Sequence, residues 1–158
     1  MITKIKEIKD FGIYKDFKWN EIDRLNPFNK KNIIYGWNYS GKTTLSNALI
    51  DGISRITPEH RVVIIEDTQE LQSNSKNKVM LRSTEKVTML RLLKATMRLR
   101  PDRIIVGETR GGEALDLLKA WNTGHPGGVA TIHANSAYGG LTRLEQLISE
   151  VSNTSMGE

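Results

Sequence analysis

The sequence predicts an α/β fold built on a mostly parallel β-sheet with helices on both faces. Short apolar runs alternate along the chain with longer segments in which apolar residues recur every three or four positions, as in strands that are each followed by a helix. Acidic or polar residues follow several of these runs directly. In an open parallel sheet, ligands bind beyond the carboxyl ends of the strands, so this second observation also indicates where a site would lie.

The first predicted strand and helix enclose a characteristic loop. Ile33 to Tyr35 is predicted to form a short buried strand and Thr44 to Ile53 a helix, and between them "GWNYSGKT" fits the pattern G-x-x-x-x-G-K-[ST]. A turn rich in glycine and serine could match this pattern by accident. The strand, the complete pattern and the helix occur together, however, which favours a phosphate-binding loop at a helix N-terminus.

The fixed positions of this loop have physical roles in nucleotide binding. Gly36 and Gly41 allow a tight turn whose N–H groups reach phosphate oxygens. Lys42 would contact the terminal phosphates of ATP, and the hydroxyl of Thr43 would be a ligand of Mg2+. The other predicted ATP-binding residues of the loop and helix start are Trp37, Asn38, Tyr39, Ser40 and Thr44.

Carboxylates follow the second predicted strand. The apolar run from Val62 to Ile65 turns acidic at Glu66, Asp67 and Glu70. Acids at the carboxyl end of a strand are well placed for a metal ion or an attacking water, and an ordinary polar loop is the alternative.

Two further strands are predicted to end at polar residues. Ile104 to Val106 precedes Glu108, which could polarise the water that attacks the γ-phosphate. Val129 to Ile132 ends at His133, for which a γ-phosphate sensor is favoured over a metal ligand, because no third ligand follows at a suitable spacing. The helices after these strands are predicted from apolar residues at Leu115, Leu118 and Trp121, and at Leu141, Leu144, Ile148 and Val151.

Composition narrows the possible functions. A chain of 158 residues can form one domain with a core, and the lack of cysteine excludes disulfides and cysteine-ligated metal. No apolar run approaches the roughly 20 residues that span a bilayer. The opening "MITKIKEIKD" is too charged for a secretory signal, so the sequence favours a cytoplasmic location.

The net charge of +5 is unevenly distributed. Between Lys76 and Arg103 nine residues are basic and two are acidic. On a helix predicted from Glu85 to Leu99, the apolar stripe is Leu90, Leu93 and Met97, and the basic face is Arg91, Lys94 and Arg98. This face could contact nucleic acid, an acidic partner or anionic lipid, but a solvated face or a subunit contact is favoured. We therefore expect at most weak, non-specific DNA binding.

Three segments resemble, in order, the motifs of the type II/IV secretion ATPases, and among them the conjugal-transfer ATPases of the TrbB group. "IIEDTQELQ" resembles the acidic box. "TMRLRPDRIIVGETRGGEALDLLKAWNTGHPGG" resembles the Walker B region, with glycine in place of the usual aspartate, and "GHPGGVATIHANSA" resembles the histidine box. The resemblance runs from about Gly41 to Met156. It implies a RecA-like P-loop NTPase fold and a Mg2+-dependent ATPase that energises DNA or protein transfer by secretion machinery at the inner membrane.

The resemblance also assigns roles to residues of this chain. Asp67 joins Thr43 as a metal ligand, and Arg110 matches the arginine that follows the Walker B glutamate and joins the nucleotide-binding residues. The catalytic residues that it implies are Glu66, Glu70, Glu108 and His133.

The first forty or so residues resemble a different P-loop group. "MITKIKEIKDFGIYKDFKWN" and "NIIYGWNYSGKTTLS" are similar to the opening of the ATPase heads of RloC/PrrC-like anticodon nucleases, in which antiparallel strands precede the loop. We expect an antiparallel strand segment over residues 1–32, an ATPase core over residues 33–158, and a mosaic chain joined near Thr43 to Asn47. The alternation that fits one such strand is Phe11, Ile13, Phe17 and Trp19.

The segment before the loop affects the expected activity. Secretion ATPases carry a domain there that builds a homohexamer and supplies arginines to neighbouring sites, whereas 35 residues precede Gly36 in this sequence. We therefore expect ATP binding with slow turnover and a mostly monomeric chain. The alternatives are a nucleotide-binding module without turnover and the ATPase head of a RloC/PrrC-like nuclease system.

Overall fold

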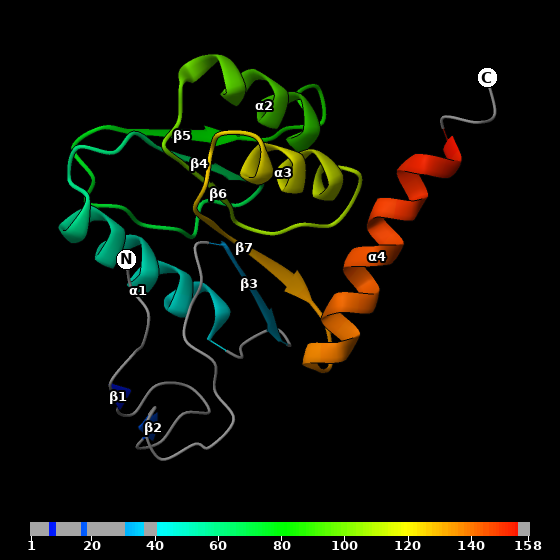
Figure 1. The fold of residues 1–158 in the computed structure, drawn as a ribbon, viewed down its shortest axis with the longest axis horizontal. Coiled ribbons are helices and arrows are strands. Elements are labelled where there is room, and N and C mark those ends of the chain that lie inside the picture. Colours follow the sequence, from blue (N-terminus) through cyan, green and yellow to red (C-terminus); the bar gives the residue numbers. More distant parts are fainter. Residues whose placement is uncertain (1–6, 9–16, 19–30, 37–40, 155–158) are drawn as a thin grey trace.

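The computed structural model describes residues 7–8, 17–18, 31–36 and 41–154. Its main feature is a five-stranded sheet in the order β3-β7-β6-β4-β5, in which every neighbouring pair is parallel (Figure 1). The predicted α/β fold with a mostly parallel sheet is therefore confirmed. The strands are β3 (Lys31–Gly36), β4 (Val62–Glu66), β5 (Lys78–Arg82), β6 (Arg103–Val106) and β7 (Gly128–His133).

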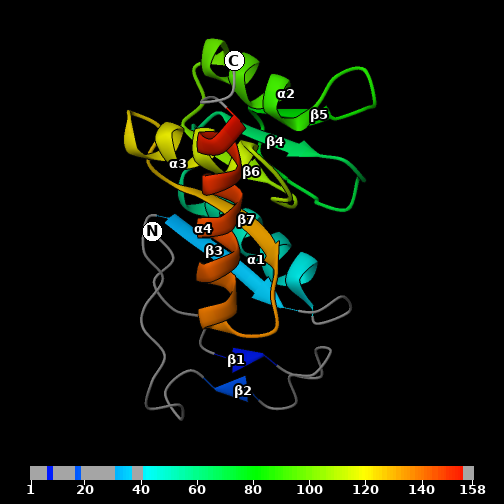
Figure 2. The same ribbon diagram turned by 90° about the vertical axis from the view of Figure 1, so that its right-hand side faces the viewer.

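Helices cover both faces of this sheet, as predicted. On one face lies α1 (Lys42–Ile56), whose Leu49 and Ile50 pack with Val62 and Ile64 of β4. Figure 2 shows α4 in front of α3 and β7, with α1 behind them. The helices of the second face are α2 (Met89–Thr96), α3 (Glu113–Asn122) and α4 (Ala137–Thr154).

The position of β4 inside the sheet explains why its sequence is a continuous apolar run. Val62 and Ile64 face α1, whereas Val63 and Ile65 belong to the cluster that contains α2 and α3. All four side chains are buried, as expected of a parallel strand that is covered on both faces.

The edge strand β5 was not predicted from the sequence. Val79 and Leu81 pack against the core, while Lys78, Met80 and Arg82 are exposed. The strand thus has the alternating pattern of a half-buried edge strand, but its exposed lysine and arginine were interpreted only as part of the basic segment.

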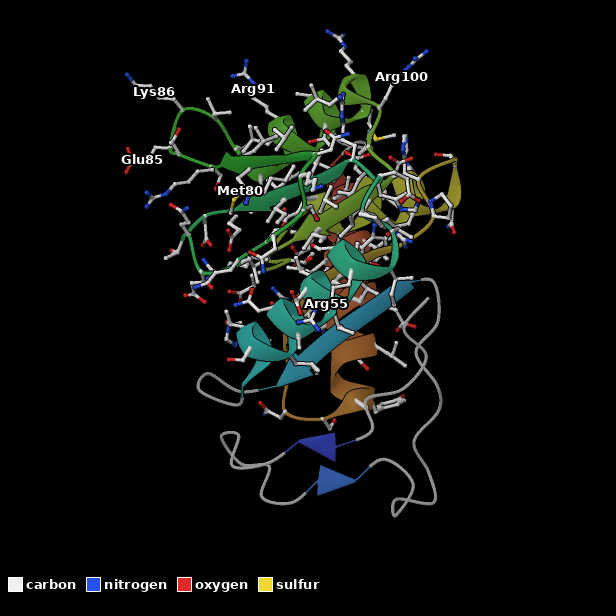
Figure 3. The ribbon with its side chains drawn as sticks, turned by 90° about the vertical axis from the view of Figure 1, so that its left-hand side faces the viewer. Arg55, Met80, Glu85, Lys86, Arg91 and Arg100 are labelled. Atoms are coloured by element: carbon white, nitrogen blue, oxygen red, sulfur yellow. The ribbon has the colours of Figure 1, made fainter. Side chains whose placement is uncertain are left out.

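The basic segment continues into α2, which begins at Met89 rather than at the predicted Glu85. Thr88 ends the preceding turn, and its hydroxyl accepts a hydrogen bond from the Arg91 N–H, as an N-cap residue does. The predicted stripe is partly confirmed, because Leu93 is buried and Met97, now in a short 3-10 turn, packs against the core. Figure 3 shows Arg91 extending away from the protein. The exposed residues of the basic face are Arg91, Lys94 and Arg98.

The last two helices are present, but their predicted faces were imprecise. In α3 the buried residues include Leu117 and Trp121, whereas Leu115 and Leu118 are only half-buried. In α4 Leu147 is fully buried, and Leu141, which was predicted to face the core, is 61% exposed. The sequence assigned the helices correctly, but small residues such as Ala114 take core positions that a count of large apolar residues misses.

The N-terminal segment contributes a separate antiparallel pair, β1 (Glu7–Ile8) and β2 (Phe17–Lys18). Antiparallel pairing before the loop is thus confirmed for these four residues. The expected strand positions Phe11, Ile13 and Trp19 lie outside the described residues. Among the helices that the structure describes, none combines the length and the apolar character needed to cross a bilayer.

Candidate functional site

The predicted functional residues meet at one edge of the sheet. Because all five strands are parallel, the ends of β3, β4, β6 and β7 lie at the same edge, and the N-terminus of α1 begins there. The register places Gly36, the last residue of β3, beside His133, the last residue of β7. Ile65 of β4 likewise lies beside Val106 of β6, so Glu66 and Gly107 follow at the same level.

The start of α1 has the properties of a phosphate-binding helix terminus. Gly41 precedes the helix with φ 83°, a left-handed conformation that favours glycine. Lys42 is half-buried, and burial lowers the pKa of its ammonium group, while the charges of Glu108 and Glu70 oppose that shift. Thr44 is exposed on the first turn. The other predicted loop residues, Trp37, Asn38, Tyr39 and Ser40, lie outside the described part of the chain.

Thr43 is connected to the acidic segment after β4. Its hydroxyl donates a hydrogen bond to Oε2 of Glu70, at 3.0 Å. Asn47, one turn further along α1, donates to the Glu70 carbonyl at 3.5 Å and accepts from the Gln72 N–H at 2.8 Å. These contacts hold the segment against α1, and Asn47 is a residue whose role no sequence motif indicated.

Glu66 is the buried acid of the segment. It is only 5% exposed, and its Oε1 accepts hydrogen bonds from the backbone N–H groups of Glu70, at 3.1 Å, and Leu71, at 2.8 Å. Burial raises the pKa of Glu66, and the two N–H groups oppose that shift. Glu66 therefore shapes the backbone that presents Glu70, whose own carboxylate is exposed.

Gly107, which the family resemblance places where the usual Walker B aspartate stands, lies against Glu66. A Cβ atom at Gly107 would lie 2.9 Å from Cγ of Glu66, closer than real Cβ contacts allow. The backbone N–H of Gly107 donates to the Ile65 carbonyl at 2.8 Å, which fixes the end of β6 beside β4. The side chain of Glu66 thus occupies the space that any side chain at position 107 would need.

Glu108 lies at the centre of a charged network. Its Oε1 is 2.7 Å from Nε2 of His133, and its Oε2 accepts a hydrogen bond from Nη2 of Arg110 at 2.6 Å. Its side chain is 15% exposed, so most of its surface is covered. The network thus joins the ends of β6 and β7.

Arg110 extends the network to β4, because its Nη1 forms an ion pair with Oδ2 of Asp67. The pKa of Arg110 is raised, first by the hydrogen bond to Glu108 and then, among smaller effects, by the charges of Glu108, Asp67 and Glu113. Asp67, the predicted metal ligand, thus pairs with Arg110. The carboxylate that lies next to Thr43 is that of Glu70.

A bound Mg2+ is compatible with these residues only in the manner of P-loop proteins. Among the described residues, no group of three or more His, Cys, Asp or Glu side chains could hold a metal ion. P-loop enzymes instead combine a protein hydroxyl with phosphate oxygens and water. The Thr43 hydroxyl beside the Glu70 carboxylate fits that kind of site.

Two more residues complete the description. Glu113, the first residue of α3, is buried and accepts hydrogen bonds from the N–H groups of Arg110 and Gly111. It was not predicted from the sequence, although an acidic residue in the first turn of a helix, here after two glycines, is a favourable pattern that could have indicated it. Nδ1 of His125 lies 2.7 Å from the carbonyl oxygen of Pro101. Pro101 precedes β6, whereas the network follows β6, so His125 is not part of the network.

Comparisons with known proteins agree with this geometry. The profile of the family described as "Type II/IV secretion system protein" matches residues 4–156. The chain is 63% identical over 126 residues to a probable conjugal transfer protein TrbB of Sinorhizobium fredii, and 60% identical over 126 residues to the conjugal transfer protein TrbB of Rhizobium radiobacter. Each match covers 80% of this chain and 39% of the relative.

A solved structure is similar as well. The VirB11 ATPase from the Brucella suis type IV secretion system, in complex with sulphate, superposes with a TM-score of 0.67 and 36% identity, over 74% of this chain and 34% of that one. The family profile also begins at residue 4 and thus includes the N-terminal segment. These matches give no support to the second resemblance, to RloC/PrrC-like ATPase heads.

Proposed function

Because the chain belongs to the type II/IV secretion system protein family, we propose that it is the ATP-binding and ATP-hydrolysing core of a conjugal-transfer or type IV secretion ATPase. The chain spans about two fifths of its TrbB relatives, at 39% of their length. The names of the relatives indicate conjugal transfer and type IV secretion, and the proposal extends this to the transfer of DNA or protein by machinery at the inner membrane.

One observation carries the proposal. The start of α1, with Lys42 and Thr43, lies at the same sheet edge as a carboxylate, Glu108, that is held on one side by His133 and on the other by Arg110. A phosphate-binding helix terminus beside a fixed carboxylate is the arrangement that phosphoryl transfer to water needs, because positioning and charge stabilisation supply most of its catalysis.

The residues of the chain then have distinct roles. Lys42 and the N–H groups at the start of α1 bind the phosphates, and Glu108 accepts a proton from the attacking water. Mg2+, when bound, neutralises charge that develops on the phosphate oxygens. Thr43 and Glu70 would hold this ion or its water ligands, since their side chains are already hydrogen-bonded to each other.

Arg110 and His133 are proposed to respond to the γ-phosphate. Both contact Glu108, so a phosphate that attracts either side chain would also change the surroundings of the catalytic carboxylate. Asp67, which pairs with Arg110, would take part in the same rearrangement rather than bind the metal directly. Binding and catalysis would in this way be linked through the contacts that Arg110 and His133 share with Glu108.

A hydrolysis assay tests the proposal. The purified chain should release phosphate from ATP in the presence of Mg2+ and not in the presence of a chelator. Lys42→Ala removes a charge from the β/γ-phosphates and should weaken ATP binding strongly in calorimetric titration. Lys86→Ala should not, because Lys86 is an exposed lysine in the loop after β5, which lies at the other end of the strand order from β3. Equal ATP affinity of the wild type and Lys42→Ala would refute the assignment of the loop.

The same assay addresses assembly. Turnover per chain is measured against protein concentration, with light scattering at each point. A turnover per chain that stays constant, together with a monomer, would mean that a single chain suffices for hydrolysis. A steep rise together with a hexamer would mean that a neighbouring chain completes the site, as an added arginine does in other P-loop enzymes.

A further inference from the structure

Glu113 is a buried carboxylate whose partners are backbone groups of the segment that carries Arg110. It is 7% exposed, and its Oε1 accepts hydrogen bonds from the Arg110 N–H at 2.7 Å and from the Gly111 N–H at 2.9 Å. A buried carboxylate is costly unless it is hydrogen-bonded, and these two bonds to N–H groups fulfil that condition. The backbone of Arg110 is thereby fixed to the first residue of α3.

The two glycines before Glu113 make this arrangement possible. A Cβ atom at Gly111 would lie 3.2 Å from Oε2 of Glu113, which would crowd the carboxylate. A Cβ atom at Gly112 would lie 2.8 Å from Cγ2 of Val151, so this position must be small for α4 to approach α3. The two glycines therefore leave room for the Glu113 side chain to reach the backbone N–H groups of Arg110 and Gly111.

Arg110 depends on a well-placed backbone. Its side chain is 63% exposed, and its guanidinium group must reach Asp67 after β4 and Glu108 after β6 at the same time. Holding a long arginine side chain in one geometry costs conformational entropy, and a displaced Cα atom would weaken its simultaneous contact with both carboxylates.

We infer that Glu113 is a positioning residue for Arg110: it fixes the loop so that the guanidinium bridges Asp67 and Glu108. The inference rests on the proposed function, in which Glu108 activates water. The competing role is purely structural, since an acid in the first turn of a helix also stabilises that helix through its dipole. Asp116 lies in the same first turn and pairs instead with Lys94 at 3.7 Å, so it provides a matched control.

Turnover of five variants separates the two roles. Glu113→Ala leaves two N–H groups without an acceptor and should lower kcat about as much as Arg110→Ala does, by roughly 10- to 100-fold, with ATP affinity retained. Glu113→Gln keeps an acceptor oxygen and should restore most of the activity. Asp116→Ala should lower thermal stability without lowering kcat. Adding Glu113→Ala to Arg110→Ala should cause no further loss of kcat, because the group that Glu113 positions is then absent.

A second measurement does not depend on hydrolysis. In NMR spectra, the guanidinium of Arg110 should show restricted rotation in the wild type, Glu113→Gln and Asp116→Ala, and free rotation in Glu113→Ala. If the wild type hydrolyses no ATP, the proposed function is wrong, and this measurement alone decides whether Glu113 positions Arg110. The inference is overturned if Glu113→Ala leaves the Arg110 signals unchanged, or if the kcat losses of Glu113→Ala and Arg110→Ala multiply.

Discussion

Replacing Gly107 with alanine should destabilise the protein by about 1–3 kcal/mol, because the new methyl group overlaps Glu66 in a closed space. The Cβ atom would lie 2.9 Å from Cγ of Glu66, a distance at which something must move. Glu66 cannot retreat easily, since it is buried and its Oε1 holds the N–H groups of Glu70 and Leu71. Without this overlap, the same substitution would stabilise the chain by about 0.4–1 kcal/mol through the unfolded state.

A double-mutant cycle with Glu66→Ala isolates the contact. Glu66→Ala alone should cost about 1–3 kcal/mol for each N–H group that is left without an acceptor. In that background Gly107→Ala should cost little or even stabilise, so the coupling between the two positions should exceed about 1 kcal/mol. Urea unfolding of the four proteins gives these free energies, provided that the slope of each unfolding curve is unchanged.

Two results of this cycle would contradict a close contact between Gly107 and Glu66. If Gly107→Ala is neutral in the wild type, or if the two substitutions are additive, then Glu66 does not fill the space beside Gly107. Amide exchange of Glu70 and Leu71 provides the companion test, because Glu66→Ala should speed exchange at both groups.

Three other predictions follow from the site and its surface. Glu108→Gln should keep ATP binding and lower turnover by about 100-fold or more, whereas unchanged turnover would move the role of base to another acid. Glu66→Gln should raise Tm at neutral pH, because it removes a buried charge and keeps an acceptor. Burial raises the pKa of Glu66 above its ordinary value of 4.5, so the gain should vanish as the pH falls through that raised pKa and the wild-type carboxyl is protonated; a gain that is constant over a pH series of melting curves would contradict this. DNA binding by the basic face should be weak and sequence-independent, and should fall by orders of magnitude between about 50 and 200 mM salt in fluorescence anisotropy; a sequence-specific, salt-resistant complex would contradict this.

The sequence predicted those parts of the site that depend on the order of residues along one strand–loop–helix unit. The phosphate-loop pattern predicted Lys42 and Thr43 at the start of a helix, and the apolar runs predicted Glu66 and Glu108 after strands. These predictions succeeded because parallel strands bring their carboxyl ends to one edge whatever their order.

Contacts between side chains that follow different strands could not be predicted in the same way. The ion pair of Arg110 with Asp67 exists because β6 lies beside β4, which depends on sheet order rather than on any local pattern. The contact of Gly107 with Glu66 arises from the same register. Strand β5 was missed because two of its three exposed positions, Lys78 and Arg82, carry charge. The face of α4 was misjudged because Leu141, although apolar, is exposed.

The bridging of Glu108 by both Arg110 and His133 has a consequence for how affinity should be interpreted. In the proposed function, each contact that a γ-phosphate gains with the Arg110 guanidinium or the His133 imidazole replaces a contact with Glu108. A measured dissociation constant therefore reports the difference between two sets of contacts, and it understates the strength of those that form. Neutralising Glu108 removes one competitor in this exchange, so Glu108→Gln should bind ATP more tightly than the wild type although it loses most of its turnover.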